Sequence, residues 1–211
     1  MTTIVEEQPV VFIIDDDEQV RESVTDLLHS VGLGAQAFGS TQEFMRAKRP
    51  DAPGCIVLDV RLPGVSGLEF QRTLADSNIQ LPVIFLTGHG DIGMSVRAIK
   101  SGAEEFLTKP FGEQELLDAV QACIEHDRVR RRHSSLVAEL EERFNSLTLR
   151  EREVLPLVIT GRMSKQIASQ LQVSEMTVKV HRGQIMRKMR ARSLVDLVRM
   201  ADKLGISPAK L

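Results

Sequence analysis

The sequence lacks the features that define several other classes of protein. Tryptophan and tyrosine are absent, aromatic residues make up 4% of the chain, and no low-complexity tract interrupts the 211 residues. Hydrophobic residues reach 42% and charged residues 27%, which is the composition of a globular protein and not of a disordered one. This length is long for one typical domain and sufficient for two small ones, so we expect two.

Long apolar runs are also missing. No stretch approaches the roughly 20 apolar residues that a membrane helix needs, and residues 1–9 carry two glutamates and no basic segment. We therefore expect no secretory leader and no membrane partner, and we expect the protein in the cytoplasm.

Cysteine is nearly absent, with one residue at Cys55 and one at Cys123. Two thiols this far apart in the sequence suggest neither a zinc site nor a disulfide framework. We expect both to be reduced residues that pack in a core.

Charge is divided unevenly along the chain. Residues 1–126 hold 9 Lys and Arg against 20 Asp and Glu, whereas residues 144–211 hold 13 against 5. An acidic half followed by a basic half suggests that one part binds cations and the other a polyanion. Charge alone is also compatible with solvated surfaces that differ by chance, so the motifs must decide.

The first half alternates short apolar runs with helical patterns. Near-continuous apolar runs at 10–14, 54–58 and 82–86 are typical of parallel strands covered on both faces. Weaker strands fit 35–38 and 105–107, and helical patterns lie at 18–30, 41–48, 68–77, 92–101 and from 113 onward. Strand and helix alternating in this way predict an α/β fold with a doubly wound, five-stranded parallel sheet.

The region after Glu113 predicts a long linker helix. From there to Asn145 the sequence contains no glycine or proline, although the segment 133–135 is a point where the helix is expected to fray. The region beyond it has only helical patterns. We expect a first domain at 9–125, a helical linker at 126–143 and an all-α domain at 144–208.

Five polar side chains stand where the predicted strands end. Asp15 and Asp16 follow the first strand, and the other three strands end at Asp59, Thr87 and Lys109. Because the carboxyl ends of parallel strands share one edge of a sheet, these side chains should form a single pocket. Three neighbouring carboxylates repel one another and should recruit a hard divalent cation, for which we expect Mg²⁺.

This pocket has the composition needed to accept a phosphoryl group. Once a metal offsets the acidic charge, Asp59 can attack phosphorus while Mg²⁺ and Lys109 neutralise the phosphoryl oxygens. Any one of the five residues alone could be a turn former or a solvated charge. Their occurrence together at successive strand ends favours a site.

Roughly the first 125 residues resemble the receiver domain of two-component response regulators, a flavodoxin-like fold. The resemblance is carried by Asp15-Asp16, by VLDVRLPG around Asp59, by LTGHGD around Thr87 and by TKPF around Lys109. It implies that a histidine kinase phosphorylates Asp59 and that Asp16, Asp59 and the backbone carbonyl of Arg61 coordinate Mg²⁺. It also implies that Asp15 acts through water and that the Lys109–Pro110 bond is cis.

The resemblance also predicts a switch. The Thr87 hydroxyl should bond to the phosphoryl group and draw in its loop, which Gly88, Gly90 and Gly93 make compliant. In the family an aromatic residue on the fifth strand follows this movement, and Phe106 stands at that position, although it could equally be a plain core residue. A third acid, Asp17, is expected to cap the first helix.

The basic half predicts a helix-turn-helix. Thr148-Leu-Arg-Glu151 is a capping box that opens a helix ending near Gly161, with Pro156 inside it. Ser164 should cap a short helix at 165–170, and Ser174 a longer cationic one that ends near Met189. Two helices joined by a tight turn, the second rich in Lys and Arg, indicate double-stranded DNA as the partner.

Residues 146–204 resemble the four-helix DNA-binding domain of the LuxR/NarL/FixJ class, through LTLREREVL, SKQIA and VSEMTVKVHR. By that resemblance, Lys179 and Val180 reach base edges and most of the other cations hold phosphates. Gly183 departs from the basic residue of some members, which puts base readout there in doubt. The last helix, 194–203, is expected to pair two copies on a two-fold operator. The expected DNA contacts are Lys165, Thr177, Lys179, Val180, His181, Arg182, Arg187 and Lys188.

The sequence thus predicts a transcriptional response regulator in which phosphorylation of Asp59 controls dimerisation and DNA binding. Beyond self-phosphorylation and self-dephosphorylation, no enzymatic activity is expected. One alternative is a Mg²⁺-dependent phosphotransferase or phosphatase that uses Asp59 as nucleophile and an anion-binding second domain. Such an enzyme would turn over many phosphoryl groups, whereas a switch would hold one. A second alternative is a DNA-binding protein with a vestigial receiver, whose operator affinity phosphoryl donors would not change.

Overall fold

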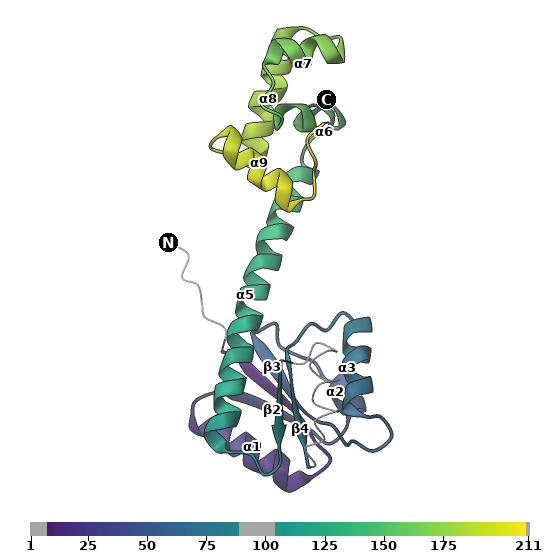
Figure 1. Ribbon diagram of the computed structural model, residues 1–211, viewed down its shortest axis with the longest axis vertical. Helices are drawn as coiled ribbons and strands as arrows, with labels where there is room; N and C mark the ends of the chain where they lie inside the picture. Colours follow the sequence, from purple (N-terminus) through teal and green to yellow (C-terminus); the bar gives the residue numbers. More distant parts are fainter. Residues whose placement is uncertain (1–7, 89–103, 210–211) are drawn as a thin grey trace. The chain divides into compact units, whose positions relative to one another are not determined.

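The computed structural model describes residues 8–88 and 104–209 of the chain. The chain divides into two compact units, residues 1–131 and 132–211, and each is described by itself (Figure 1). The helix expected at 92–101, together with Gly90 and Gly93, lies outside the described residues. None of the helices described in these ranges is long and apolar enough to cross a membrane.

The first unit contains a parallel sheet with the strand order β2-β1-β3-β4-β5. Its strands are β1 (Val10–Ile14), β2 (Gly34–Phe38), β3 (Gly54–Asp59), β4 (Val83–Thr87) and β5 (Glu105–Thr108). The order reverses between β1 and β3, and open α/β sheets place their binding sites at such a reversal. The predicted doubly wound sheet is confirmed.

Helices cover both faces of this sheet. The helix α1 (Glu18–Ser30) and the beginning of α5 (Glu113–Asn145) lie on one face, and α2 (Thr41–Arg46) and α3 (Gly67–Asp76) lie on the other (Figure 1). The helix α2 ends two residues before the predicted Lys48. Its C-cap residue, Ala47, already has an extended backbone, at φ −69° and ψ 144°.

Side chains alternate along the strands and divide the core into two layers. On β1, Val11 and Ile13 pack with α1 and α5, whereas Phe12 and Ile14 pack with α2 and α3. All four are at most 2% exposed. Burial of each such side chain contributes about 1.5–3 kcal/mol, so the apolar runs read from the sequence fix both the sheet and its position between the helices.

The helix α5 is continuous over 33 residues. The fraying expected at 133–135 is not found, since these residues are helical. Near its start Cys123 lies in the core beside Cys55. The hydrogen bond between the two thiols and their burial hold the pKa of Cys55 well above its usual value. Both thiols are free and buried, as predicted.

The second unit is helical in the residues described. It contains α6 (Leu149–Val158), α7 (Ser164–Leu171), α8 (Glu175–Met189) and α9 (Leu194–Lys203), and its core includes Val154, Ile167, Val178, Ile185 and Leu197. The predicted capping box opens α6, and Pro156 lies inside that helix.

One predicted cap in this unit is wrong. Ser164 is the first residue of α7, and Met163 occupies the cap position with an extended backbone. The Met163 N–H donates to Gln166 Oε1 at 2.9 Å, so the Gln166 side chain, and not a serine hydroxyl, completes this helix start. At α8 the prediction is confirmed, because Ser174 Oγ accepts a 3.0 Å bond from the Thr177 N–H.

Candidate functional site

The carboxyl ends of β1 and β3 bring three acids together. One carboxylate oxygen from each of Asp15, Asp16 and Asp59 lies within 4.8 Å of the other two. The strands β1 and β3 are neighbours, with Ile14 beside Leu58, so the residues that follow these two positions meet at one edge. Asp15 is 1% and Asp59 8% exposed, whereas Asp16 is open to solvent.

Lys109 joins this cluster from the end of β5. Its Nζ lies 2.6 Å from Asp15 Oδ2 and 3.3 Å from Asp59 Oδ2. The Lys109 backbone N–H donates to the Thr87 carbonyl at 2.6 Å, and Thr87 is 1% exposed at the end of β4. The Lys109–Pro110 bond is cis, as the resemblance implied. All five predicted strand-end residues therefore lie at one edge of the sheet.

The site carries more negative charge than Lys109 alone can balance. Burial raises the pKa of Asp15, although hydrogen bonds from Lys109 and from the Asp17 N–H act in the opposite direction. Burial would lower the pKa of Lys109, but its hydrogen bond to Asp15 and the charges of Asp15 and Asp59 outweigh this effect and leave the pKa raised. A cation placed among these carboxylates would thus be stabilised.

The ligand atoms fit a hard divalent cation. The cluster offers oxygen atoms from three carboxylates, and Mg²⁺ and Ca²⁺ prefer oxygen ligands while zinc prefers nitrogen and sulfur. Since Asp16 is exposed, the site has a solvent side where Mg²⁺ could keep its waters. Arg61 lies two residues after Asp59, and its backbone N–H donates to Asp59 Oδ1 at 3.2 Å.

Two residues near the site were not predicted. A Cβ atom at Gly67 would lie 2.5 Å from the Asp59 carbonyl oxygen, so a glycine is required where α3 starts against the end of β3. Arg21, on α1, donates from Nη1 to the Asp15 carbonyl at 2.8 Å. A glycine eight residues after Asp59 was a usable signal, but Arg21 looks like any helix surface residue in the sequence.

The remaining first-unit predictions concern Asp17 and Phe106. Asp17 caps α1 as predicted, because its Oδ1 accepts a 2.9 Å bond from the Gln19 N–H. Phe106 pairs with Phe85 across β4 and β5 and is half-buried against the core layer of α2 and α3. Its side chain is therefore partly open to solvent.

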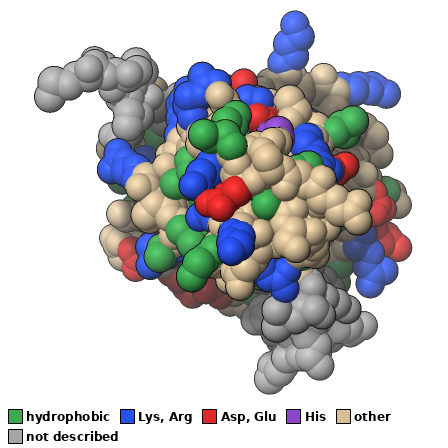
Figure 2. Space-filling view, turned by 90° about the horizontal axis from the view of Figure 1, so that it is seen from above, with side chains coloured by type: hydrophobic (Ala, Val, Ile, Leu, Met, Phe, Trp, Pro, Cys, Tyr) green, Lys and Arg blue, Asp and Glu red, His purple; other side chains and the backbone are tan. Residues whose placement is uncertain are grey.

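In the second unit, α7 and α8 present an exposed cationic surface. Lys165 on α7 and Lys179 and Arg187 on α8 are exposed, and Val180 is 54% exposed beside them. Lysine and arginine side chains project around the face seen in Figure 2, with hydrophobic side chains between them. This pattern suits a polyanion whose backbone binds the cations and whose bases meet apolar groups.

Two of the predicted phosphate contacts also make hydrogen bonds inside this unit. Lys188 donates to Glu151 Oε2 at 2.6 Å and to the Ser146 carbonyl at 3.2 Å. Arg182 donates to the Arg162 carbonyl at 2.9 Å. Both side chains thus connect α8 to other segments of this unit.

The remaining predicted contacts lie on or near the start of α8. The Thr177 hydroxyl lies 2.8 Å from the Ser174 hydroxyl, and His181 is half-buried. Lys179 pairs with Glu175 at 2.8 Å, and this hydrogen bond and charge lower the pKa of the Glu175 carboxyl.

Met176 was missed by the sequence analysis. It is 70% exposed and lies one helical turn before Val180, so it shares the exposed face of α8. An apolar side chain at helical spacing from two predicted base contacts was the available signal.

Known families match both units. The model of the response regulator receiver domain matches residues 11–121, and that of the bacterial regulatory proteins of the luxR family matches residues 145–201. The chain belongs to the response regulator family. This response regulator carries a LuxR-type DNA-binding domain, in agreement with the helix-turn-helix geometry of α7 and α8.

Relatives of this response regulator include a named transcriptional regulatory protein. It is 55% identical to nodulation protein W of Bradyrhizobium diazoefficiens over 94% of the chain and 87% of that protein. It is 43% identical to the transcriptional regulatory protein FixJ of Azorhizobium caulinodans over 94% of each. Among solved structures, the response regulator StyR matches with 47% identity and a TM-score of 0.84, covering 93% of this chain and 99% of that one.

Proposed function

We propose that this response regulator is switched by phosphorylation of Asp59 and that the switch controls sequence-specific binding to an operator. The observation that carries the proposal is the shared ammonium of Lys109, which lies between Asp15 and Asp59 in a cluster of three acids. A cation and a metal-binding acid pair beside one buried aspartate are what a phosphoryl acceptor needs.

The phosphoryl donor is the phosphohistidine of a cognate sensor histidine kinase. An oxygen of Asp59 attacks phosphorus, the P–N bond of the donor breaks, and the electron pair leaves with the histidine nitrogen. When bound by Asp16, Asp59 and the Arg61 carbonyl, with Asp15 acting through water, Mg²⁺ supplies charge neutralisation at the phosphoryl oxygens. Lys109 binds a phosphoryl oxygen and so helps to position the group on Asp59.

The conformational response begins at Thr87. Its hydroxyl bonds to the phosphoryl group, the end of β4 moves inward, and the half-buried Phe106 on β5 follows into the space that is vacated. The chemistry is a single transfer to Asp59, with self-phosphorylation from small donors and slow self-dephosphorylation as its only further reactions.

The DNA contacts proposed lie on α7 and α8. Lys179 and Val180 read bases, and His181, Arg182, Arg187 and Lys188 bind phosphates, with Lys165 and Thr177 completing the contact surface. Lys188 and Arg182 also make contacts within the unit, which hold α8 in place. Because the proposed partner is an operator on the chromosome, we expect the protein in the cytoplasm.

The proposed domain boundaries remain 9–125, 126–143 and 144–208. We propose that the last of these dimerises through α9, where Val195 is 62% exposed, either on phosphorylation or on DNA. Sedimentation on a palindromic operator should show two chains per site, and one chain per site would contradict dimerisation.

Operator affinity measured with and without acetyl phosphate and Mg²⁺ tests the function. The wild type should gain affinity, and Asp59→Asn should not. An enzyme would release many phosphoryl groups per chain, so measured turnover well above one would favour a phosphotransferase or phosphatase. Equal operator affinity in both states would favour a DNA-binding protein whose receiver is vestigial.

A further inference from the structure

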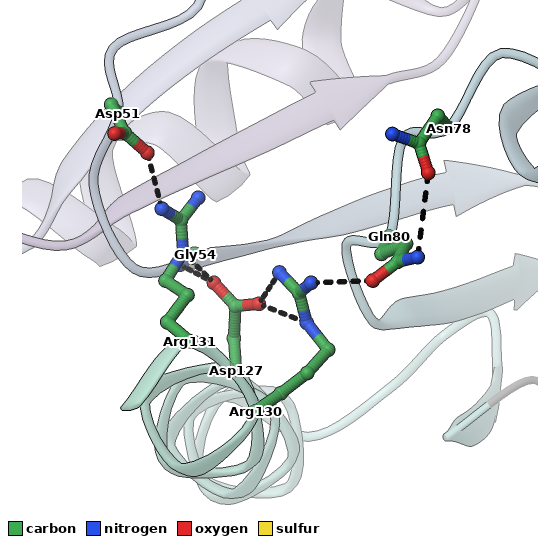
Figure 3. Close-up of polar contacts among 7 residues, drawn as sticks. All are labelled: Asp51, Gly54, Asn78, Gln80, Asp127, Arg130 and Arg131. Atoms are coloured by element: carbon green, nitrogen blue, oxygen red, sulfur yellow. Dashed lines mark hydrogen bonds and ion pairs between the residues drawn. The ribbon is translucent and has the colours of Figure 1, made fainter. Parts of the chain in front are cut away.

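Another buried carboxylate of the first unit lies at the amino end of β3, opposite the end that carries Asp59. Asp127 on α5 is 0% exposed, and it accepts hydrogen bonds from two arginines and from a backbone N–H (Figure 3). A buried carboxylate is costly unless hydrogen bonds and opposite charges replace its water. Here both oxygens have such partners, so this is a built network and not a surface ion pair.

The first partner of Asp127 is the beginning of β3. The Gly54 N–H donates to Asp127 Oδ2 at 3.1 Å. A Cβ at Gly54 would lie 2.1 Å from the Val10 carbonyl oxygen, so the Gly54 backbone is packed tightly against β1. The strand held in this way at Gly54 ends at Asp59.

Arg130 connects the same carboxylate to the segment before β4. Its Nε donates to Asp127 Oδ1 at 3.0 Å, and its Nη1 donates to Gln80 Oε1 at 2.8 Å. Gln80 in turn donates to Asn78 Oδ1 at 3.4 Å (Figure 3). The strand that this segment enters, β4, ends at Thr87.

Arg131 completes the network on the other side. Its Nε donates to Asp127 Oδ2 at 2.7 Å, and its Nη1 pairs with Asp51, which precedes β3 (Figure 3). Arg130 and Arg131 stand three and four residues after Asp127, so one helix face presents all three side chains. We call Asp127, Arg130 and Arg131 the α5 clamp.

The position of the α5 clamp in the chain is informative. Arg131 is the last residue of the first compact unit, while α5 continues to Asn145. The side chain of the next residue, Arg132, is exposed and makes no hydrogen bond or ion pair with the residues that the structure describes. The α5 clamp thus lies where α5 leaves the receiver. It binds the amino end of β3 and the segment before β4, the two strands that end at Asp59 and Thr87.

We propose that Asp127 is a positioning residue that couples the receiver to the linker. Through the α5 clamp it makes β3, β4 and the last receiver turn of α5 move as one body, so that a shift at Asp59 and Thr87 is transmitted to the linker helix. This inference rests on the proposed phosphorylation of Asp59. The coupling role differs from phosphorylation because Asp127 acts after phosphoryl transfer and takes no part in the transfer.

The test compares full-length variants at a temperature where each is folded. Asp127→Asn keeps nearly the same side-chain volume but removes the negative charge that pairs with both arginines. It also replaces one of the two acceptor oxygens with an amide donor, which cannot accept a bond from the Gly54 N–H or from an arginine. Arg131→Met keeps Asp127, Arg130 and the Gly54 bond but removes the contacts to Asp51 and Oδ2. Arg132→Met is the matched control, because it removes the same charge from the neighbouring exposed position.

Three readouts separate coupling from plain stability. Intact mass after acetyl phosphate and Mg²⁺ should show normal phosphoryl uptake in all variants. Hydrogen exchange should show faster amide exchange at 126–131 and at Gly54 in Asp127→Asn and Arg131→Met. The gain in operator affinity on phosphorylation should shrink at least about fivefold in these two variants, a typical size for coupling between sites, and should be unchanged in Arg132→Met.

The outcomes distinguish this inference from the function on which it rests. If the wild type gains affinity on phosphorylation and both clamp variants keep that gain, the coupling role is wrong and the network serves stability alone. If Asp127→Asn loses phosphoryl uptake, Asp127 acts on the phosphorylation site and the proposed position after transfer is wrong. A wild type without any gain overturns the proposed function, and the coupling with it.

Discussion

The ammonium of Lys109 lies 3.3 Å from Oδ2 of Asp59, the residue that ends β3. The same ammonium lies closer to Asp15, at 2.6 Å, so one cation is shared unequally between two buried carboxylates. Asp59 is thus the less strongly paired acid of the two. Its Oδ1 accepts a hydrogen bond from the Arg61 N–H, and its Oδ2 faces the Lys109 ammonium, which is the cation that a phosphoryl acceptor needs beside it.

Asp16→Asn should weaken Mg²⁺ binding. Asp16 is the exposed member of the acidic cluster, so the amide should leave the fold intact. It should reduce metal affinity by at least about tenfold, the smallest typical loss for a supporting carboxylate, because a proposed direct ligand loses its charge. Phosphoryl uptake from acetyl phosphate, measured against Mg²⁺ concentration, gives the affinity. Asp17→Asn is the control, because Asp17 caps α1 and should leave the curve unchanged. Superimposable curves for Asp16→Asn and the wild type would contradict the metal site.

Gly67→Ala should damage the site through the backbone. A Cβ at this position would lie 2.5 Å from the Asp59 carbonyl oxygen, so the end of β3 must shift. We expect a loss of about 1–3 kcal/mol in the free energy of unfolding together with slower phosphoryl uptake. Urea unfolding and intact mass measure the two effects. Gly39→Ala is the control, since its Cβ would meet nothing closer than 3.7 Å. Equal stability and equal phosphoryl uptake in the two variants would show that a glycine is not required at position 67.

Glu151→Gln should change the pH dependence of stability in the second unit. Burial would raise the pKa of Glu151, but bonds from Lys188 and the Thr148 N–H outweigh it and lower the pKa below the usual 4.5. Because the folded pKa is lowered, this stabilisation is present above pH 4.5 and is lost as pH falls through the folded value.

The amide variant should therefore be less stable at neutral pH by about 1.5–3 kcal/mol, and the difference from the wild type should shrink below pH 4.5. Thermal unfolding from pH 3 to pH 7, roughly the window over which an unfolded carboxylate titrates, measures it. Glu153→Gln, which removes an exposed pair with Arg150, should cost no more than about 1 kcal/mol. A pH-independent difference for Glu151→Gln would exclude the ion pair as its cause.

Lys179 and Arg187 should affect DNA binding in different ways. Lys179→Met should relax sequence preference at one base position, by about 1–3 kcal/mol per mismatch. Arg187→Met should weaken binding to all sequences and reduce the slope of affinity against salt by about one unit. Operator titrations at several salt concentrations, with matched and mismatched sites, separate the two. Identical salt slopes and identical base preferences would contradict this division of roles.

The strands and helices of the first unit could be predicted because their sequences carry a strong periodic signal. The runs 10–14 and 54–58 are apolar at nearly every position, since β1 and β3 are buried on both faces. The ends of such strands then place Asp15 and Asp59 at one edge with no further information. Capping followed the same logic at Asp17, Thr148 and Ser174, where a short polar side chain precedes a helical pattern.

What the sequence did not reveal depends on contacts between distant segments. Lys188 was predicted as a phosphate contact because it is a cation on α8, and its ion pair with Glu151 could not be read from the sequence. Asp127, Arg130 and Arg131 read as an ordinary helix surface, since acid and base at such spacing are common on solvated faces. Only the packing of α5 against β3 shows that Asp127 is buried.

Intact-mass measurement of the full chain after treatment with acetyl phosphate and Mg²⁺ tests the central claim most directly. We predict that the wild type gains the mass of one phosphoryl group and that Asp59→Asn gains none, while omission of Mg²⁺ prevents the gain. An unchanged wild-type mass, or a phosphoryl group that Asp59→Asn still accepts, would contradict the account of this acidic cluster as a phosphorylation site.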